Sequence, residues 1–243
     1  AVVLMLIPLG GIIWIKKNAI GGSIGASLVG QVSAAEIYPM FSCPCCGQPL
    51  DKNKICCDQA QERIDFIDSS VKPGVSDNDV VSAYIKKYGL NSFIDKNKAK
   101  EIKEELVKNA PAERPIISIS PSSLDLGDVS QKKGVVFAYF DLKNEGKKDL
   151  VINSMDTSCG CTSAAIIFDG QEGPRFAMPG HGIENPTGWR VVIPPGGIAQ
   201  LKVYYDPTVH KDLIGAVIRE ILVYSNDPID FEKKVQIELT QVN

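Results

Sequence analysis

The sequence predicts a mainly β protein, in which a seven-stranded β-sandwich follows a small α-helical unit and an N-terminal hydrophobic helix. Short apolar runs separated by Gly, Pro, Asn and Asp fill the second half of the chain, as in strands joined by turns. Two runs with helical spacing precede them. Five of the seven cysteines lie just before those two runs, so the helical unit is predicted to be cysteine-rich.

Five segments are expected from these changes in composition. They are a hydrophobic anchor or signal segment at 1–17, a Gly/Ser-rich tether at 18–40, a cysteine-rich helical hairpin at 41–94, a charged helix and linker at 95–115, and the sandwich at 116–243. The net charge of −3 gives no indication of a nucleic-acid partner. The sequence contains no nucleotide-binding fingerprint and no Cys-x-x-Cys-His for haem, so neither cofactor is expected.

The N-terminal segment predicts attachment to a membrane. Residues 1–15 are uncharged and mostly apolar, although about 20 residues are needed to span a bilayer. Lys16 and Lys17 favour a cytoplasmic position for the end of this run. Residues 18–35 are a flexible tether, a weak second crossing or the site of a signal cleavage. We therefore expect a membrane partner, with the bulk of the chain extracytoplasmic, either periplasmic or on the cell surface.

Two helices are expected in the hairpin unit. The first covers 58–71, where apolar residues recur at helical spacing until "KPG" ends the pattern. The second begins at a capping box formed by Ser76 and Asp79 and ends at Gly89. The charged run at 96–108 predicts an exposed helix that acts as a spacer between the two folded units.

Seven strands are then expected, each closed by a turn-forming sequence. Their sequences are "IISIS", "VVFAYFDL", "LVINSM", "WRVVI", "AQLKVYYD", "REILVYS" and "VQIELT". The long segment between the third and fourth strands, 163–188, is interpreted as an insertion.

The C-terminal half resembles a bacterial family of Ig-like domains of unknown function, related to the Hydin-like (ASH) sandwiches. The resemblance lies in "LDLGDV", "FDLKNEG", "LVINSMDTSCGCTSA", "IPPGG", "VYYDP" and "YSNDP", in that order. Its most specific motif is Ser-Cys-Gly-Cys-Thr. The resemblance implies an Ig-like fold and an extracytoplasmic location, and it implies no reaction.

Residues 41–94 resemble the thiol domain of cytochrome c maturation proteins of the CcmH type. Cys43 and Cys46 take the positions of that family's Cys-x-x-Cys, and "GVSDNDVVSAYIKKYG" matches its last helix. The chain departs from the family by having five cysteines where the family has two. The resemblance implies reduction of apocytochrome thiols, a role for which the family uses two cysteines.

Cys159 and Cys161 can act together on one partner atom. A disulfide across a single intervening residue is strained and easily reduced, whereas two thiolates can bind one soft metal ion without such strain. If consecutive strands run antiparallel, the third and fifth strands end at the same pole of the sandwich. That pole would gather both cysteines with His210, and the insertion would bring His181 and Met178 there.

Three interpretations of this pole stay open. Cys, His and Met ligands suit copper, and two Cys with two His suit zinc. The cysteines are otherwise a redox-active thiol pair, or structural thiols packed against the insertion.

The N-terminal cysteines form a dense group, which we call the knot. Its members are Cys43, Cys45, Cys46, Cys56 and Cys57. A zinc site can use Cys43, Cys46 and Cys56 with either Cys45 or Cys57. Disulfides, or a catalytic thiol pair with Cys57 activated at a helix N-terminus, are the other interpretations.

These observations predict a membrane-attached extracytoplasmic accessory protein. It would bind a soft metal, zinc or copper, or exchange thiols with a partner protein of the cell envelope. Cys43, Cys46, Cys159 and Cys161 are the expected redox thiols, and thiol–disulfide exchange is the sole enzymatic activity that the sequence supports. The alternative is a non-catalytic structural module that docks to an envelope assembly, with its cysteines serving only as staples.

Overall fold

The computed structural model describes residues 33–43, 46–181 and 183–243. The hydrophobic helix expected at 1–17, most of the tether and Cys45 lie outside this range. None of the helices in the described part of the chain is long and apolar enough to cross a membrane.

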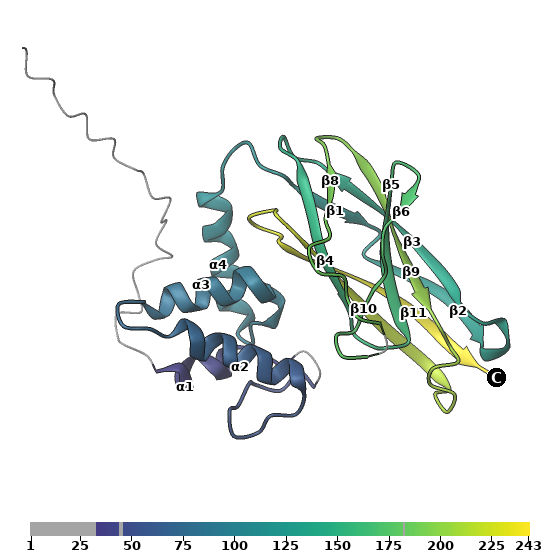
Figure 1. The fold of residues 1–243 in the computed structure, drawn as a ribbon, viewed down its shortest axis with the longest axis horizontal. Helices are drawn as coiled ribbons and strands as arrows, with labels where there is room; N and C mark the ends of the chain where they lie inside the picture. Colours follow the sequence, from purple (N-terminus) through teal and green to yellow (C-terminus); the bar gives the residue numbers. More distant parts are fainter. Residues whose placement is uncertain (1–32, 44–45, 182) are drawn as a thin grey trace, which may run out of the picture.

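The C-terminal unit is a β-sandwich of two sheets (Figure 1). One sheet holds β1 (Ile117–Ser120), β3 (Val136–Asn144), β9 (Ile198–Tyr205), β5 (Thr162–Phe168), β6 (Gln171–Glu172) and β7 (Phe176–Ala177). The other holds β2 (Ser123–Ser130), β11 (Glu232–Val242), β10 (Gly215–Ser225), β4 (Leu150–Thr157) and β8 (Val191–Ile193). Inward-facing side chains of both sheets form one core, with Phe140, Ile152, Leu201 and Ile237 among its buried members. The prediction of a mainly β, sandwich-like fold is confirmed.

The number of strands differs from the seven expected, because the described residues contain eleven. The seven predicted runs correspond to β1, β3, β4, β8, β9, β10 and β11. Strand β2 was missed because it is largely polar; it pairs in parallel with β11 at an edge of its sheet. Strand β5 was interpreted as part of the insertion because its buried run, Thr162–Ile166, lacks the alternation of a half-exposed strand. Strands β6 and β7 are only two residues long.

The N-terminal unit is helical. Its elements are α1 (Ala34–Ile37), the 3₁₀ turn η1 (Tyr38–Met40), α2 (Asp58–Ser70), α3 (Asp77–Tyr88), η2 (Leu90–Ser92) and α4 (Lys96–Asn109). Helix α3 begins at the capping box of Ser76 and Asp79, and Gly89 follows its last residue with φ of 81°. Apolar faces of α2 and α3 pack on Phe41, whose ring stacks on Tyr84 with centroids 3.7 Å apart.

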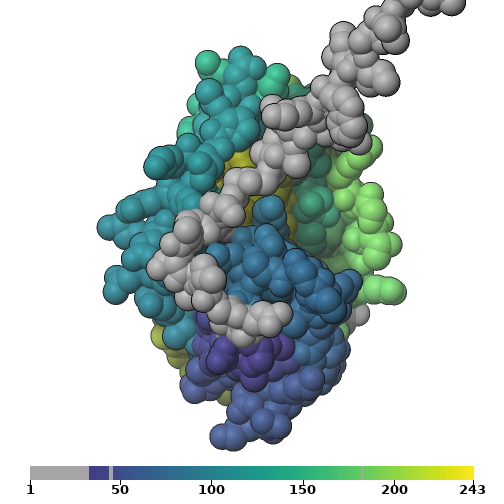
Figure 2. Space-filling model, turned by 90° about the vertical axis from the view of Figure 1, so that its left-hand side faces the viewer, coloured from purple at the N-terminus to yellow at the C-terminus, as the bar shows by residue number. Residues whose placement is uncertain are grey.

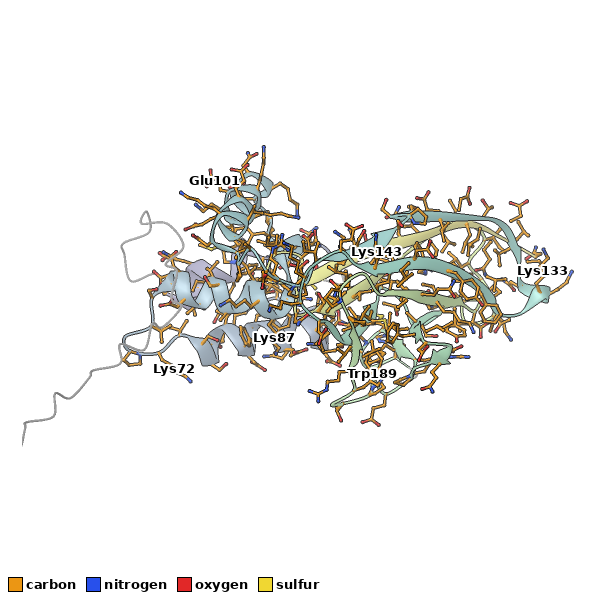
Figure 3. The ribbon with its side chains drawn as sticks, turned by 90° about the horizontal axis from the view of Figure 1, so that it is seen from above. Lys72, Lys87, Glu101, Lys133, Lys143 and Trp189 are labelled. Carbon is orange, nitrogen blue, oxygen red and sulfur yellow. The ribbon has the colours of Figure 1, made fainter. Side chains whose placement is uncertain are left out.

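Helix α4 does not hold the two units apart, contrary to its interpretation as a spacer. Its Ile102 is 4% exposed and packs in the helical core, which the charged residues around it concealed in the sequence. Lys103 Nζ on the same helix lies 2.7 Å from Asp230 Oδ1 in the β10–β11 turn. Figure 3 accordingly places Lys87 of the helical unit at the junction with the sandwich and Lys133 at the far end of the molecule.

The two units meet through the turn between β10 and β11 and the start of β11. Phe231 is 9% exposed and belongs to the helical core although it lies in the sandwich. Asn91 Nδ2 donates to Glu232 Oε1 at 3.0 Å. Gly89 permits this close approach, because a Cβ atom at that position would overlap the Glu232 carboxylate. Figure 2 shows the helical unit, in purple and blue, lying against the end of the sandwich.

Buried ionisable groups line this junction. The Arg63 guanidinium lies 4.7 Å from the Tyr88 ring centroid and donates to the Tyr84 hydroxyl at 3.4 Å. Burial raises the pKa of Glu232 to about 7 and that of Asp156 to about 6. The docked units therefore favour the protonated form of both carboxyl groups.

The raised pKa of Glu232 predicts a pH-dependent stability. Its contribution is fully present below the ordinary value of 4.5 and is lost as pH rises to about 7. The wild-type protein should lose free energy of unfolding as the pH rises through this range. In Glu232→Gln this loss should be smaller by about 2 kcal/mol, since each unit of pKa shift corresponds to about 1.4 kcal/mol. Urea unfolding at about pH 5 and pH 8 measures this difference.

The control is Glu104→Gln, which removes an exposed carboxylate of α4 whose side chain is 68% exposed. This variant should keep the pH dependence of the wild type. An equal loss of stability with pH in the Glu232→Gln and wild-type proteins would contradict the assignment to Glu232.

Candidate functional site

The first candidate site lies at the turn that joins β4 to β5, at one pole of the sandwich. These strands belong to different sheets, so Ser158–Cys161 must carry the chain from one sheet to the other. The buried Thr157 side chain holds the turn, because its Oγ1 donates to the carbonyl oxygens of Cys159 at 3.1 Å and Thr162 at 2.9 Å. The turn thereby presents Cys159 and Cys161 on one side.

The two thiols of the turn are in direct contact. Their Sγ atoms lie 2.7 Å apart, and the Cys161 amide also donates to Cys159 Sγ at 3.4 Å. Cys161 is 3% exposed, while Cys159 is half-buried. An external reactant therefore reaches Cys159 before Cys161.

The structure brings His210 to this pole. Its Nε2 lies 3.2 Å from Cys159 Sγ. The end of β9 is tied to the thiol turn, since the Asp206 amide donates to the Cys161 carbonyl at 2.8 Å. Gln241 Nε2 then donates to the His210 carbonyl at 3.2 Å and holds the following loop. Cys159, Cys161 and His210 are near enough to one another to hold a metal ion.

The other two residues expected at the pole take different positions. The His181 side chain lies against Gly160, but its Nδ1 atom is 3.2 Å from the Pro179 carbonyl oxygen. His181 is not part of the cysteine–histidine group. Met178 lines a cavity of about 900 Å³ between the helical unit and the sandwich. In the described residues, then, the insertion supplies neither His181 nor Met178 to that group.

Arg219 is a site residue that the sequence did not reveal. Its Nε donates to Cys161 Sγ at 3.1 Å, and its Nη1 donates to the Ile218 carbonyl at 2.8 Å. It reaches the turn because β10 pairs with β4, bringing Glu220 O within 3.0 Å of the Ser158 amide. Nothing local marks Arg219, because the pairing joins segments 58 residues apart.

The contacts of the pair favour a single negative charge. The pKa of Cys159 falls to about 5, chiefly because Cys161 hydrogen-bonds to its sulfur, and His210 lowers it further. The pKa of Cys161 is raised by the same shared proton and by burial, while Arg219 opposes that rise. At neutral pH the two sulfurs therefore share one proton, beside the fixed positive charge of Arg219.

The second candidate site is the knot beside the helical core. The chain turns sharply after Cys43, where the Gly47 amide donates to the Cys43 carbonyl at 2.9 Å and Gly47 has φ of 70°. Cys43 is 3% exposed and packs in the helical core, which anchors one side of the knot. Cys57 is the N-cap of α2, so the start of that helix positions the other side.

Three of the knot sulfurs converge, and a fourth, that of Cys46, contacts one of them. Cys56 Sγ lies 3.3 Å from Cys43 Sγ, 3.4 Å from Cys46 Sγ and 3.9 Å from Cys57 Sγ. Cys43 Sγ and Cys57 Sγ are 3.6 Å apart. A tetrahedral zinc ion with bonds of about 2.3 Å requires sulfurs about 3.8 Å apart. Cys43, Cys56 and Cys57 form a group that can hold a metal ion, and Cys46 lies next to it.

The comparisons with known proteins leave the activity of the chain open. Residues 117–171 match a family described as "Protein of unknown function (DUF1573)". This match includes both Cys159 and Cys161 but covers less than half of the chain. No curated protein sequence matches the chain.

Solved structures with likeness to the chain are distant. A protein of unknown function from Porphyromonas gingivalis W83 has 21% identity and a TM-score of 0.39, over 53% of this chain and 48% of that one. The chain thus spans about half the length of that protein. The human CEP192 ASH/PapD-like domain 7 has 11% identity and a TM-score of 0.35, over 55% of this chain and 89% of that domain.

The two histidines near the thiol turn predict different effects on Cys159. Replacing His210 with Ala should raise the pKa of Cys159 by roughly one unit, because a hydrogen bond to the thiolate is lost. The matched variant His181→Ala should leave it unchanged. The rate of iodoacetamide labelling against pH, followed by mass spectrometry of the peptide that contains Cys159, gives the pKa. Equal shifts in both variants would refute the separate placement of the histidines.

Proposed function

We propose that the protein is a membrane-attached extracytoplasmic accessory protein that binds zinc, a borderline-soft metal, in its N-terminal knot. One observation carries the metal assignment: the sulfurs of Cys43, Cys56 and Cys57 lie 3.3–3.9 Å from one another, and Cys46 Sγ lies 3.4 Å from Cys56 Sγ. Three thiolates at that spacing, with Cys46 moving in as a fourth ligand, would complete a closed tetrahedral site, the arrangement of structural zinc centres. Copper(I) is the alternative soft metal for the same sulfurs.

A bound metal ion would neutralise the negative charge of the knot thiolates. The hydrogen bonds that the Cys56 thiol donates to the sulfurs of Cys43 and Cys46 raise the pKa of Cys56 when no metal is bound. A bound divalent cation deprotonates its thiol ligands, so metal uptake would release protons. The ligands span the segment from Cys43 to the N-cap of α2, so binding would also fasten this segment onto the helical core.

The remaining parts of the proposal rest on the sequence. The apolar run at 1–15 supports attachment to a membrane. The extracytoplasmic location is supported by the family resemblance, and an envelope protein as partner is proposed with it. The structural-module alternative assigns the knot cysteines to disulfide staples, and the metal content and thiol state of the protein distinguish it from metal binding.

The knot predicts about one tightly bound zinc ion per chain, held by thiolates. Elemental analysis of the full chain purified under reducing conditions should detect it, and Co(II) substitution should give the intense thiolate-to-metal absorption of a sulfur-rich site. Cys56→Ser should reduce the metal content strongly, because Cys56 contacts all three of the other sulfurs. Cys161→Ser at the sandwich pole is the matched control and should retain the metal.

Two results would count against this function. One is a metal-free protein whose knot cysteines are joined as disulfides, which would support the staple alternative. The other is a metal content that falls in Cys161→Ser and not in Cys56→Ser, which would move the metal to the pole.

A further inference from the structure

The two cysteine clusters differ in the spacing of their sulfurs. Sulfurs that share a tetrahedral metal lie about 3.8 Å apart, and those of the knot approach this spacing. Cys159 Sγ and Cys161 Sγ are only 2.7 Å apart. A disulfide bond is about 2.05 Å long, so the pole pair stands nearer to a disulfide than to a shared metal.

Arg219 also opposes a metal at the pole. Its guanidinium is directed at Cys161 Sγ by the 3.1 Å contact from Nε and is fixed by the bond from Nη1 to the Ile218 carbonyl. Arginine keeps its charge at every relevant pH. This permanent cation repels a metal ion and stabilises a thiolate on Cys161.

Access to the pair is one-sided. Cys161 is buried at 3% exposure, whereas Cys159 is half-buried. A shallow depression of about 530 Å³ lies beside the pair. It is lined by His210 and Arg219, which contact the two thiols, and by Val209 and 211–213. An incoming sulfur in this depression would meet the positive charges of Arg219 and Lys211 against the single negative charge of Asp212, a balance that favours its thiolate form.

We propose that Cys159 and Cys161 form a thiol–disulfide exchange site that passes a disulfide to paired cysteine thiols of a partner polypeptide. This site is separate from the zinc knot and does not depend on it. Cys159 is the sulfur that is attacked, Cys161 is the leaving group, and Arg219 is a positioning residue that stabilises the departing thiolate.

The exchange begins with the Cys159–Cys161 disulfide. A substrate thiolate attacks Cys159 Sγ, a substrate–Cys159 bond forms, and the Cys159–Cys161 bond breaks with its electron pair going to Cys161. The second substrate thiolate then attacks the substrate sulfur of this mixed disulfide, and Cys159 leaves with the electron pair. The substrate is oxidised to a disulfide and the pair is reduced by two electrons. Of the two substrate protons, one is retained between Cys159 and Cys161 and the other is released.

The ring geometry sets the favoured direction. A disulfide between cysteines separated by one residue is strained, and strained disulfides have more oxidising potentials. Arg219 adds to this effect, because its positive charge stabilises the single negative charge that the two sulfurs share in the reduced pair. The pair is therefore suited to donating its disulfide rather than to reducing that of another protein.

Equilibration of the full chain in glutathione buffers tests the proposal. Mass spectrometry of alkylated peptides should show a Cys159–Cys161 disulfide that dithiothreitol reduces stoichiometrically, yielding oxidised dithiothreitol. In Cys161→Ser, Cys159 should accumulate as a mixed disulfide with glutathione, because no neighbouring sulfur can displace it. In Cys159→Ser, the buried Cys161 should form little of this adduct.

Variants of Arg219 separate positioning from packing. Arg219→Gln should shift the equilibrium with glutathione by roughly tenfold toward the disulfide, because the reduced thiolate loses a charge-assisted hydrogen bond. Arg219→Lys should restore part of the wild-type equilibrium by returning the charge. Lys211→Gln removes a positive charge from the same depression and should change the equilibrium far less.

Two outcomes would overturn the proposal. The first is a pair that stays as dithiols in strongly oxidising glutathione. The second is a metal ion that protects both pole thiols from alkylation and persists when the knot is disrupted by Cys56→Ser. Loss of zinc from the knot with exchange intact at the pole would defeat the proposed metal function alone, so the two proposals fail separately.

Discussion

The passage of the chain from β4 to β5 is the constraint on which the pole depends. Facing sheets lie about 10 Å apart, and four residues, Ser158–Cys161, connect a strand of one sheet to a strand of the other. Thr157 satisfies two carbonyl groups of this tight crossing with a single hydroxyl. Cysteines on either side of Gly160 are thereby forced together, and the neighbouring β9 and β10 bring a histidine and an arginine to the same point.

A second constraint joins the two units. The β10–β11 turn and the first residues of β11 enter the helical unit, where Phe231 completes an apolar core and Glu232 takes a buried position against Gly89 and Asn91. Strand β10 thus contributes Arg219, its fifth residue, to the thiol pole, and its C-terminal end leads into the junction. A change in the docking of the helices would act on the same strand that holds the pole arginine.

The sequence predicted well those helices and strands whose formation depends on residues close to one another in the chain. The capping box of Ser76 and Asp79 and the apolar spacing of α2 and α3 need no distant partner, so both helices lie close to where they were expected. Strand alternation likewise located β3, β9 and β11. The strands β2 and β5 were missed, because β2 is a polar edge strand and β5 is a buried run without alternation. Strand parity placed His210, whereas Arg219 depended on a cross-strand pairing that no local pattern reveals.

The same reasoning separates the two cysteine clusters, which their sequences alone left open between metal, redox and structural roles. In the knot, the sulfurs of Cys43, Cys56 and Cys57 lie 3.3–3.9 Å from one another, a spacing close to that of thiolates that share a cation, and Cys46 contacts one of them. At the pole, one short turn holds Cys159 Sγ and Cys161 Sγ 2.7 Å apart. Arg219 already supplies a positive charge beside these sulfurs. Spacing and the neighbouring cation, rather than the number of thiols, thus favour metal binding at one cluster and sulfur–sulfur chemistry at the other.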